Sequence, residues 1–144
     1  MGQFRGEFNH ANVEKIETKH RIWKPLLDYP YADSISQAPI LYHVDSFYVF
    51  GGYDRTNNKL VSAIARFTVS TGKWSKPGEL TTKRRNHGAI LIDGSFIVIG
   101  GLNDNPTERC TTGEEVKCVD QEPLLNNYYS YPELFLVNSN YCPE

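Results

Sequence analysis

The apolar residues of this chain come in short runs rich in Val, Ile, Phe and Tyr, and turn-forming clusters such as VDS, STG, IDG and VNS separate them. Runs of this kind predict β-strands joined by tight turns. The segment EKIETKHRIW fits a strand, a turn and a second strand as well as it fits a helical period, and no other segment favours a helix. The sequence therefore predicts an all-β fold. The clearest expected strands lie at 38–44, 47–52, 62–69, 73–77, 87–92 and 95–101.

The strand pattern also repeats. The stretch SFYVFGGYD returns further along the chain as SFIVIGGLN, so that Gly51 recurs 49 residues on as Gly100. Trp23 recurs 51 residues on as Trp74. A period of about 40 to 50 residues made of strands alone is typical of β-propellers, in which each four-stranded blade buries its faces against neighbouring blades.

Within one period, an apolar hairpin ends in Gly-Gly, a variable loop follows, and an aromatic residue then precedes a Trp by about seven positions. This pattern resembles the kelch repeat, most clearly over residues 37–101. The resemblance implies a fragment of a kelch-type β-propeller with about three four-stranded antiparallel blades. It divides the chain into the second half of a preceding blade at 1–36, a kelch repeat at 37–83, a divergent repeat with a cysteine hairpin at 84–124, and the first hairpin of a truncated blade at 125–144.

About three blades are fewer than the four to eight with which propellers close. Each blade needs a neighbour on both sides, because an uncovered blade leaves apolar faces and strand edges exposed. We therefore expect the chain to associate with the remaining blades of a propeller or with a second copy of itself.

The glycines of the two Gly-Gly pairs are expected to have a structural role, because a strand that turns sharply against nearby backbone needs positive φ and no Cβ. These glycines are Gly51, Gly52, Gly100 and Gly101. A phosphate-binding role is the alternative, but no helix and no Lys-Ser/Thr signal follows either pair. Trp23 and Trp74 are expected to pack between blades.

The three cysteines depart from the repeat. In the first two units an apolar residue lies seven positions before the Trp, as Phe67 does before Trp74, whereas Cys110 and Cys118 take both places in the third unit. Facing positions on adjacent strands bring Cβ atoms near the distance of a disulfide, so a Cys110–Cys118 disulfide is expected. Inert thiols, or a metal-binding or catalytic role, remain open, although no CxxC spacing supports zinc. Cys142 has no partner in this pattern.

The formal net charge is -2 and the pI about 6.1, so no overall positive field attracts nucleic acid or anionic membranes. No apolar run has the length of a membrane span, and the N-terminal stretch lacks the apolar core of a secretory signal. A disulfide implies an oxidising compartment. We therefore expect an extracellular location if Met1 is not the native start, and a cytoplasmic one otherwise.

The candidates for enzymatic chemistry are four His, nine Tyr and scattered carboxylates, and no pair of them has a motif spacing. Galactose oxidase is a kelch propeller that holds copper with Tyr, His and Cys side chains, and this chain contains all three types without a recognisable arrangement of them. We therefore predict no catalytic residue, no metal and no cofactor. A fragment of a galactose-oxidase-like enzyme and a structural extracellular spacer are the alternatives.

The resemblance instead implies binding of a protein partner through loops at one rim of the propeller. Arg is favoured at such sites because its planar fork pairs with carboxylates, and Tyr because it offers a large area with a polar tip. An acidic partner is therefore expected, with a merely solvated charge run as the alternative. The expected binding residues are Lys83, Arg84, Arg85 and His87 in one loop and Tyr53, Asp54 and Arg55 in a second, longer loop.

Overall fold

The computed structural model describes residues 14–17, 19–32, 34–101 and 107–122, together with Pro132 and Leu134. Every regular element among them is a β-strand, which confirms the all-β prediction. None of these residues belongs to a helix of the length and apolarity needed to cross a membrane. The hairpin expected at 125–144, with Cys142, lies outside the described residues apart from Pro132 and Leu134.

Eleven strands follow one another along the described residues. They are β1 (Glu14–Glu17), β2 (Ile22–Pro25), β3 (Ile35–Ser36), β4 (Ile40–His43), β5 (Ser46–Asp54), β6 (Lys59–Thr68), β7 (Lys73–Glu79), β8 (His87–Ile92), β9 (Ser95–Gly100), β10 (Thr107–Cys110) and β11 (Val116–Gln121).

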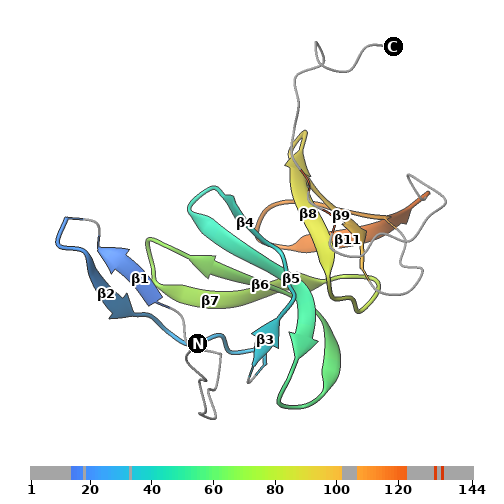
Figure 1. Cartoon of the computed structure of the whole chain (residues 1–144). Helices are drawn as coiled ribbons and strands as arrows, with labels where there is room; N and C mark the ends of the chain where they lie inside the picture. The colour runs from blue at the N-terminus through green and yellow to red at the C-terminus, as the bar shows by residue number, and fades with distance from the viewer. Residues whose placement is uncertain are drawn as a thin grey trace.

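Two four-stranded antiparallel meanders dominate the structure. Strands β4 to β7 form the first meander and β8 to β11 the second, while β1 and β2 form a separate two-stranded sheet (Figure 1). A short parallel pairing of β7 with β11 joins the meanders into one strongly curled nine-stranded sheet. At this junction a Cβ on Gly78 would lie 2.0 Å from the carbonyl oxygen of Val116, so only glycine fits. An all-β chain with this arrangement is consistent with part of a β-propeller.

The hairpin turns of the two meanders are built alike. Val44 and Asp45 link β4 to β5 with φ of 40° and 56°, and Asp93 and Gly94 link β8 to β9 with φ of 47° and 69°. Two successive residues of positive φ make a type I′ turn, whose twist matches that of a hairpin. The turns expected at VDS and IDG are thus confirmed. A β-branched residue such as Val44 is poorly suited to positive φ.

The Gly-Gly pairs have the backbone conformation that the sequence predicts. The φ angles are 54° and 107° at Gly51 and Gly52, and 72° and 114° at Gly100 and Gly101. A Cβ on Gly51 would lie 2.9 Å from the carbonyl oxygen of Val61. Side chains are disfavoured at these positions by both the φ angle and the close backbone.

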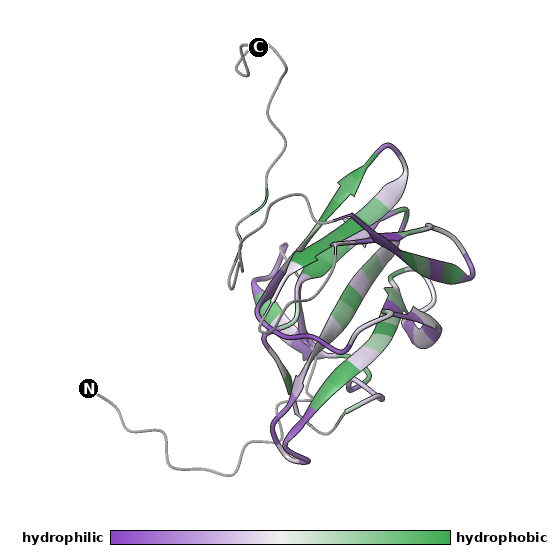
Figure 2. Ribbon diagram, turned by 90° about the vertical axis from the view of Figure 1, so that its right-hand side faces the viewer, coloured by the Kyte–Doolittle hydropathy of each residue, from purple (hydrophilic) through white to green (hydrophobic). Residues whose placement is uncertain are grey.

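The main core lies between the two meanders. The Phe96 ring of β9 lies 4.8 Å from that of Tyr48 and 5.1 Å from that of Phe50, both on β5. Figure 2 shows how hydrophobic residues follow the strands whereas hydrophilic ones gather at the turns. A second cluster lies on the opposite face of the first meander, where Val49 and Ala65 pack with Tyr29, Tyr31, Ala32, Ile35 and Ala38.

The pairs expected from the repeat lie opposite each other in register. Ile16 faces Trp23, Phe67 faces Trp74, and Cys110 faces Cys118. Trp74 packs 5.2 Å from the Phe67 ring, and its indole Nε1 donates a hydrogen bond of 2.9 Å to the carbonyl oxygen of Leu27. Trp23 is 61% exposed.

The expectation that Trp23 packs between blades is therefore wrong for the structure described. The reason is that β1 pairs with β2 alone, so the hairpin forms a sheet of its own and its side chains stay open to solvent.

Candidate functional site

Backbone hydrogen bonds bring the two candidate loops to the same end of the meanders. The N–H of Gly52 donates to the carbonyl oxygen of Arg84 at 2.9 Å, and the N–H of Arg55 donates to that of Ser34 at 2.9 Å. The segments that meet here come from three places in the sequence. We define the rim as residues 34–36, 53–59 and 81–86.

An arginine stacked on a tyrosine lies at the centre of the rim. The guanidinium carbon of Arg85 lies 4.5 Å from the centroid of the Tyr53 ring, and the Tyr53 hydroxyl donates to the side-chain oxygen of Asn58. The exposed Arg55 donates from its Nε to the hydroxyl of Ser36 at 3.2 Å. A cation over an aromatic face is attracted by the ring, which limits the orientations of Arg85.

The rim carries an excess of positive charge. Its cations are Arg55, Lys59, Lys83, Arg84 and Arg85, against Asp54 within the rim and two carboxylates that contact it from β10 and β11, Glu108 and Asp120. Lys83 is exposed, and Lys59 is 61% exposed, with its Nζ 3.9 Å from a carboxylate oxygen of Asp54. Because the whole chain has a formal net charge of -2, this positive patch is local.

Unlike Arg55, Lys59 and Lys83, Arg84 is not exposed. Its side chain is fully buried, and its guanidinium lies 2.6 Å from a carboxylate oxygen of Glu108 and donates to the carbonyl oxygen of Gly100 at 3.1 Å. Glu108 also accepts from the backbone N–H groups of Thr81 at 2.7 Å and Thr82 at 3.3 Å. Burial lowers the pKa of Arg84, although the Glu108 charge acts in the opposite direction.

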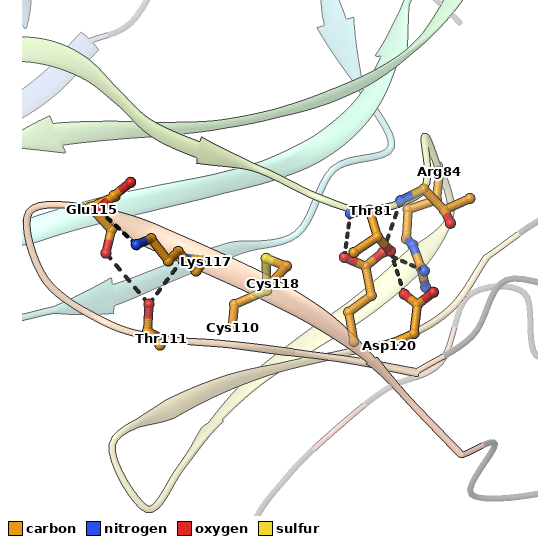
Figure 3. The surroundings of a disulfide bond; sticks show 10 residues. Thr81, Arg84, Cys110, Thr111, Glu115, Lys117, Cys118 and Asp120 are labelled. Carbon is orange, nitrogen blue, oxygen red and sulfur yellow. Dashed lines mark hydrogen bonds and ion pairs between the residues drawn. A yellow bond between two sulfur atoms is a disulfide. The ribbon is translucent and has the colours of Figure 1, made fainter.

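The expectation that Arg84 contacts a partner is therefore wrong. Its side chain instead fastens the rim loop to β10 of the second meander, next to the cysteine hairpin (Figure 3).

Asp54 and His87 are also buried rather than exposed. Asp54 accepts hydrogen bonds from the backbone N–H of Asn57 at 3.1 Å and from its side-chain amide at 2.8 Å. Burial raises the pKa of Asp54, but these hydrogen bonds and the charge of Lys59 outweigh it, so the pKa is lowered. Burial and the nearby charge of Arg84 lower the pKa of His87 to about 3.

The physical reason for the Asp54 correction is the length of the turn. Strand β5 continues through Asp54 and β6 begins at Lys59, so the longer loop expected to carry Tyr53, Asp54 and Arg55 is a four-residue turn. Asp54 closes this turn with its side chain. His87 is buried because it begins β8, where it pairs with Gly100 of β9. Neither side chain is available to a partner.

The expected disulfide between Cys110 and Cys118 is present. The two Cα atoms lie 4.0 Å apart across β10 and β11, closer than in a hydrogen-bonded pair of strands. Cys110 is buried in the core and Cys118 is half-buried. The ligand atoms of Glu108 lie within 4.8 Å of both sulfurs, but the disulfide occupies the sulfurs and the carboxylate is paired with Arg84.

Glu108 is the residue that the sequence interpretation missed. By register, Ala65 faces Val49 in the first meander, and Glu108 faces Val98 at the equivalent place in the second. Ala65 shares an apolar cluster with Ile35, which lies 49 positions before Arg84. The signal was thus a pair of opposite charges at two positions that are apolar in the first unit.

No family model matches the chain. A stretch of 70 residues, 46% of the chain, is 29% identical to the Ras guanine nucleotide exchange factor F of Dictyostelium discoideum. The match covers 6% of that protein. The similarity is thus confined to a small part of a much longer protein.

Proposed function

We propose that this chain is part of a kelch-type β-propeller and that it binds an acidic protein surface through the rim. Two four-stranded meanders with equivalent Gly-Gly conformations, equivalent type I′ turns and equivalent cross-strand pairs support the repeat. The binding role rests on one observation above all, the placement of Arg85 over Tyr53 beside the exposed Arg55.

The geometry of the stack suits a carboxylate partner. The Tyr53 ring holds the Arg85 guanidinium through its π face, with the guanidinium carbon 4.5 Å from the ring centroid, and this contact uses none of the N–H donors as a hydrogen bond to an acceptor atom. A planar fork of this kind pairs with a carboxylate through two parallel hydrogen bonds. Arg55 and Lys83 add positive charge at the same end of the molecule, which favours encounter with an acidic surface.

The charged groups near the rim favour binding over catalysis. Arg84 and Glu108 neutralise each other in the interior, and Asp54 is held by the turn that it closes. These groups therefore serve the structure of the rim. The exposed Arg55 and Lys83 and the half-buried Arg85 remain for a partner.

The test compares a rim variant with a matched control. Arg55→Ala with Arg85→Ala removes two rim cations, and Lys73→Ala with Arg109→Ala removes two exposed cations from β7 and β10, away from the rim. Both pairs change the net charge equally. Binding is measured to arrays of acidic, neutral and basic peptides of one length, at low and at moderate salt.

We expect the wild type and the control to retain acidic peptides in a salt-dependent manner, and the rim variant to lose this binding by about tenfold. Equal retention by both variants, or no preference for acidic peptides in the wild type, would contradict the proposal.

A further inference from the structure

Each meander has two faces, and register pairs assign residues to them. In the first meander, face A carries Leu41, Tyr48, Phe50 and Ile64, and face B carries Ile40, Tyr42, Phe47, Val49, Ala65, Phe67 and Trp74. In the second meander, face A carries the apolar Ile90, Ile97, Ile99 and Val119 with the exposed Arg109 opposite Ile97, and face B carries Ala89, Leu91, Phe96, Val98, Cys110 and Cys118.

Inside the chain, face B of the second meander packs on face A of the first. Phe96 is the centre of this interface, because it is fully buried and lies in contact with Tyr48 and Phe50. Leu41 of face A and Leu91 of face B are partly buried around the same cluster. The interface therefore buries an aromatic residue of face B between two large residues of face A.

Among the described residues, those at the equivalent places on the two outer faces are less buried. Phe47 occupies the place of Phe96, 49 positions earlier, and is 42% exposed, whereas Phe96 is 0% exposed. Its cross-strand neighbour Tyr42 is 60% exposed. On the other outer face, Ile97 and Ile99 occupy the places of the buried Tyr48 and Phe50 and are only half-buried. The chain thus displays both halves of an interface that it already forms internally.

We propose that these outer faces bind each other between two copies of the chain. Phe47 of one copy packs between Ile97 and Ile99 of the second, as Phe96 packs between Tyr48 and Phe50 within one chain. The interface is head-to-tail, because it joins two different faces, and such interfaces close into rings or continue as open chains.

The sizes of the side chains favour this pairing. Tyr42 is larger than Leu91, its equivalent in the internal interface, whereas Ile97 and Ile99 are smaller than Tyr48 and Phe50. Large residues on one outer face therefore meet small residues on the other, which preserves the total packed volume.

In both meanders, the segment that precedes the first strand covers only the end of face B near the rim. In the first, residues 29–32 and 34–38 cover the end near the rim, where Val49 and Ala65 lie, and leave Phe47 open. In the second, Leu80 and Arg84 of the 80–86 segment lie at the equivalent end, and face A of the first meander covers the remainder. The open region on the first meander is therefore the region that a face A covers in the second.

The chain itself contacts the outer face A at Gly88, which faces Ile99 across β8 and β9. A Cβ on Gly88 of β8 would lie 2.8 Å from the side chain of Leu134. Ile97 and Ile99 on β9 remain half-buried beside this contact. A second copy therefore has these two isoleucines as its docking site.

Two variants test the pairing, Phe47→Glu on one outer face and Ile97→Glu on the other. Val69→Glu is the control, because Val69 is 46% exposed in the turn between β6 and β7 and belongs to neither face. Association of each protein is followed by analytical ultracentrifugation over a range of concentrations. If either face variant lacks a cooperative thermal transition, Tyr42→Glu and Ile90→Glu replace the pair.

We expect the wild type and Val69→Glu to self-associate and each face variant to do so at least about tenfold more weakly. An equimolar mixture of the two face variants should recover heterodimers, since one wild-type face A and one wild-type face B remain in it. A monomeric wild type, or a mixture that stays monomeric, would overturn the proposal. Unchanged association of Ile97→Glu would also overturn it, because it would indicate that face B binds face B.

Discussion

The buried guanidinium of Arg84 lies 2.6 Å from the buried carboxylate of Glu108. In the first meander the equivalent places hold Ile35 and Ala65, which belong to one apolar cluster. One unit of the repeat therefore has an apolar cluster where the next has an ion pair. In both units the residue of the segment before the first strand, Ile35 or Arg84, attaches that segment to its meander.

This equivalence predicts a specific mutational pattern. Arg84→Ala or Glu108→Ala should each reduce the free energy of unfolding by about 3–5 kcal/mol, because either change leaves an uncompensated buried charge. The double variant Arg84→Ile with Glu108→Ala copies the first meander and should lose much less. Urea denaturation measures all three. A double variant less stable than both single variants would contradict the equivalence.

The disulfide should contribute measurably to stability. Replacing Cys110 and Cys118 by Ala should lower the free energy of unfolding by about 2–3 kcal/mol, the value expected for closing so short a loop. Denaturation of the oxidised protein with and without a reducing agent gives the same comparison without mutation. Peptide mapping of unreduced native protein should recover both cysteines in one cross-linked fragment; alkylation of both before reduction would show that native material lacks the bond.

His87 should make stability depend on pH. Because its native pKa of about 3 lies below the usual 6.5, the unfolded chain binds a proton that the native chain does not. The free energy of unfolding should therefore be constant above pH 6.5 and fall below it, by up to about 1.4 kcal/mol per pH unit. Denaturation measured between pH 6.5 and 4.5 tests this dependence at pH values above the pKa of most carboxylates. His87→Asn should flatten the profile; an equally steep profile in that variant would assign the effect elsewhere.

The turn between β4 and β5 should be improvable. Val44 is 76% exposed and has a φ of 40°, which a β-branched residue adopts poorly. Val44→Asn supplies a residue preferred in a type I′ turn and keeps Asp45, whose carboxylate accepts a hydrogen bond of 3.2 Å from the Ser70 N–H, so it should raise the free energy of unfolding by about 0.5–1 kcal/mol. A thermal melt measures the change. The control is Thr71→Asn in the turn between β6 and β7, because Thr71 does not have a positive φ. This variant should give no gain, and a gain there would point to a general effect of composition.

Much of the fold could be predicted because the repeat records it twice. The φ angles at Gly51 and Gly100 are positive, as the sequence predicts for these two glycines. The same spacing predicts that Phe67 lies opposite Trp74 and Cys110 opposite Cys118, as the register confirms. Spacing carries this information because strands of equal length in successive units put equivalent residues in register.

The candidate site was less predictable, since exposure of a loop residue depends on what packs against it. Arg84 and Arg85 are neighbours in sequence, yet one is buried on Glu108 and the other stacks on Tyr53. Nothing in the run of cations distinguishes them. The distinction requires the register that brings β10 under the rim loop, a long-range relation that local pattern does not contain.

The most direct measurement of the central claim is an exchange of charge at the rim. Arg55→Glu with Arg85→Glu should abolish binding of the acidic peptides that the wild type retains, and should create binding to the same peptides with every Asp and Glu replaced by Lys. Lys73→Glu with Arg109→Glu, which alters net charge equally, should change neither preference. If the rim variant still binds acidic peptides, or if the control variant switches preference as well, the rim is not the binding site.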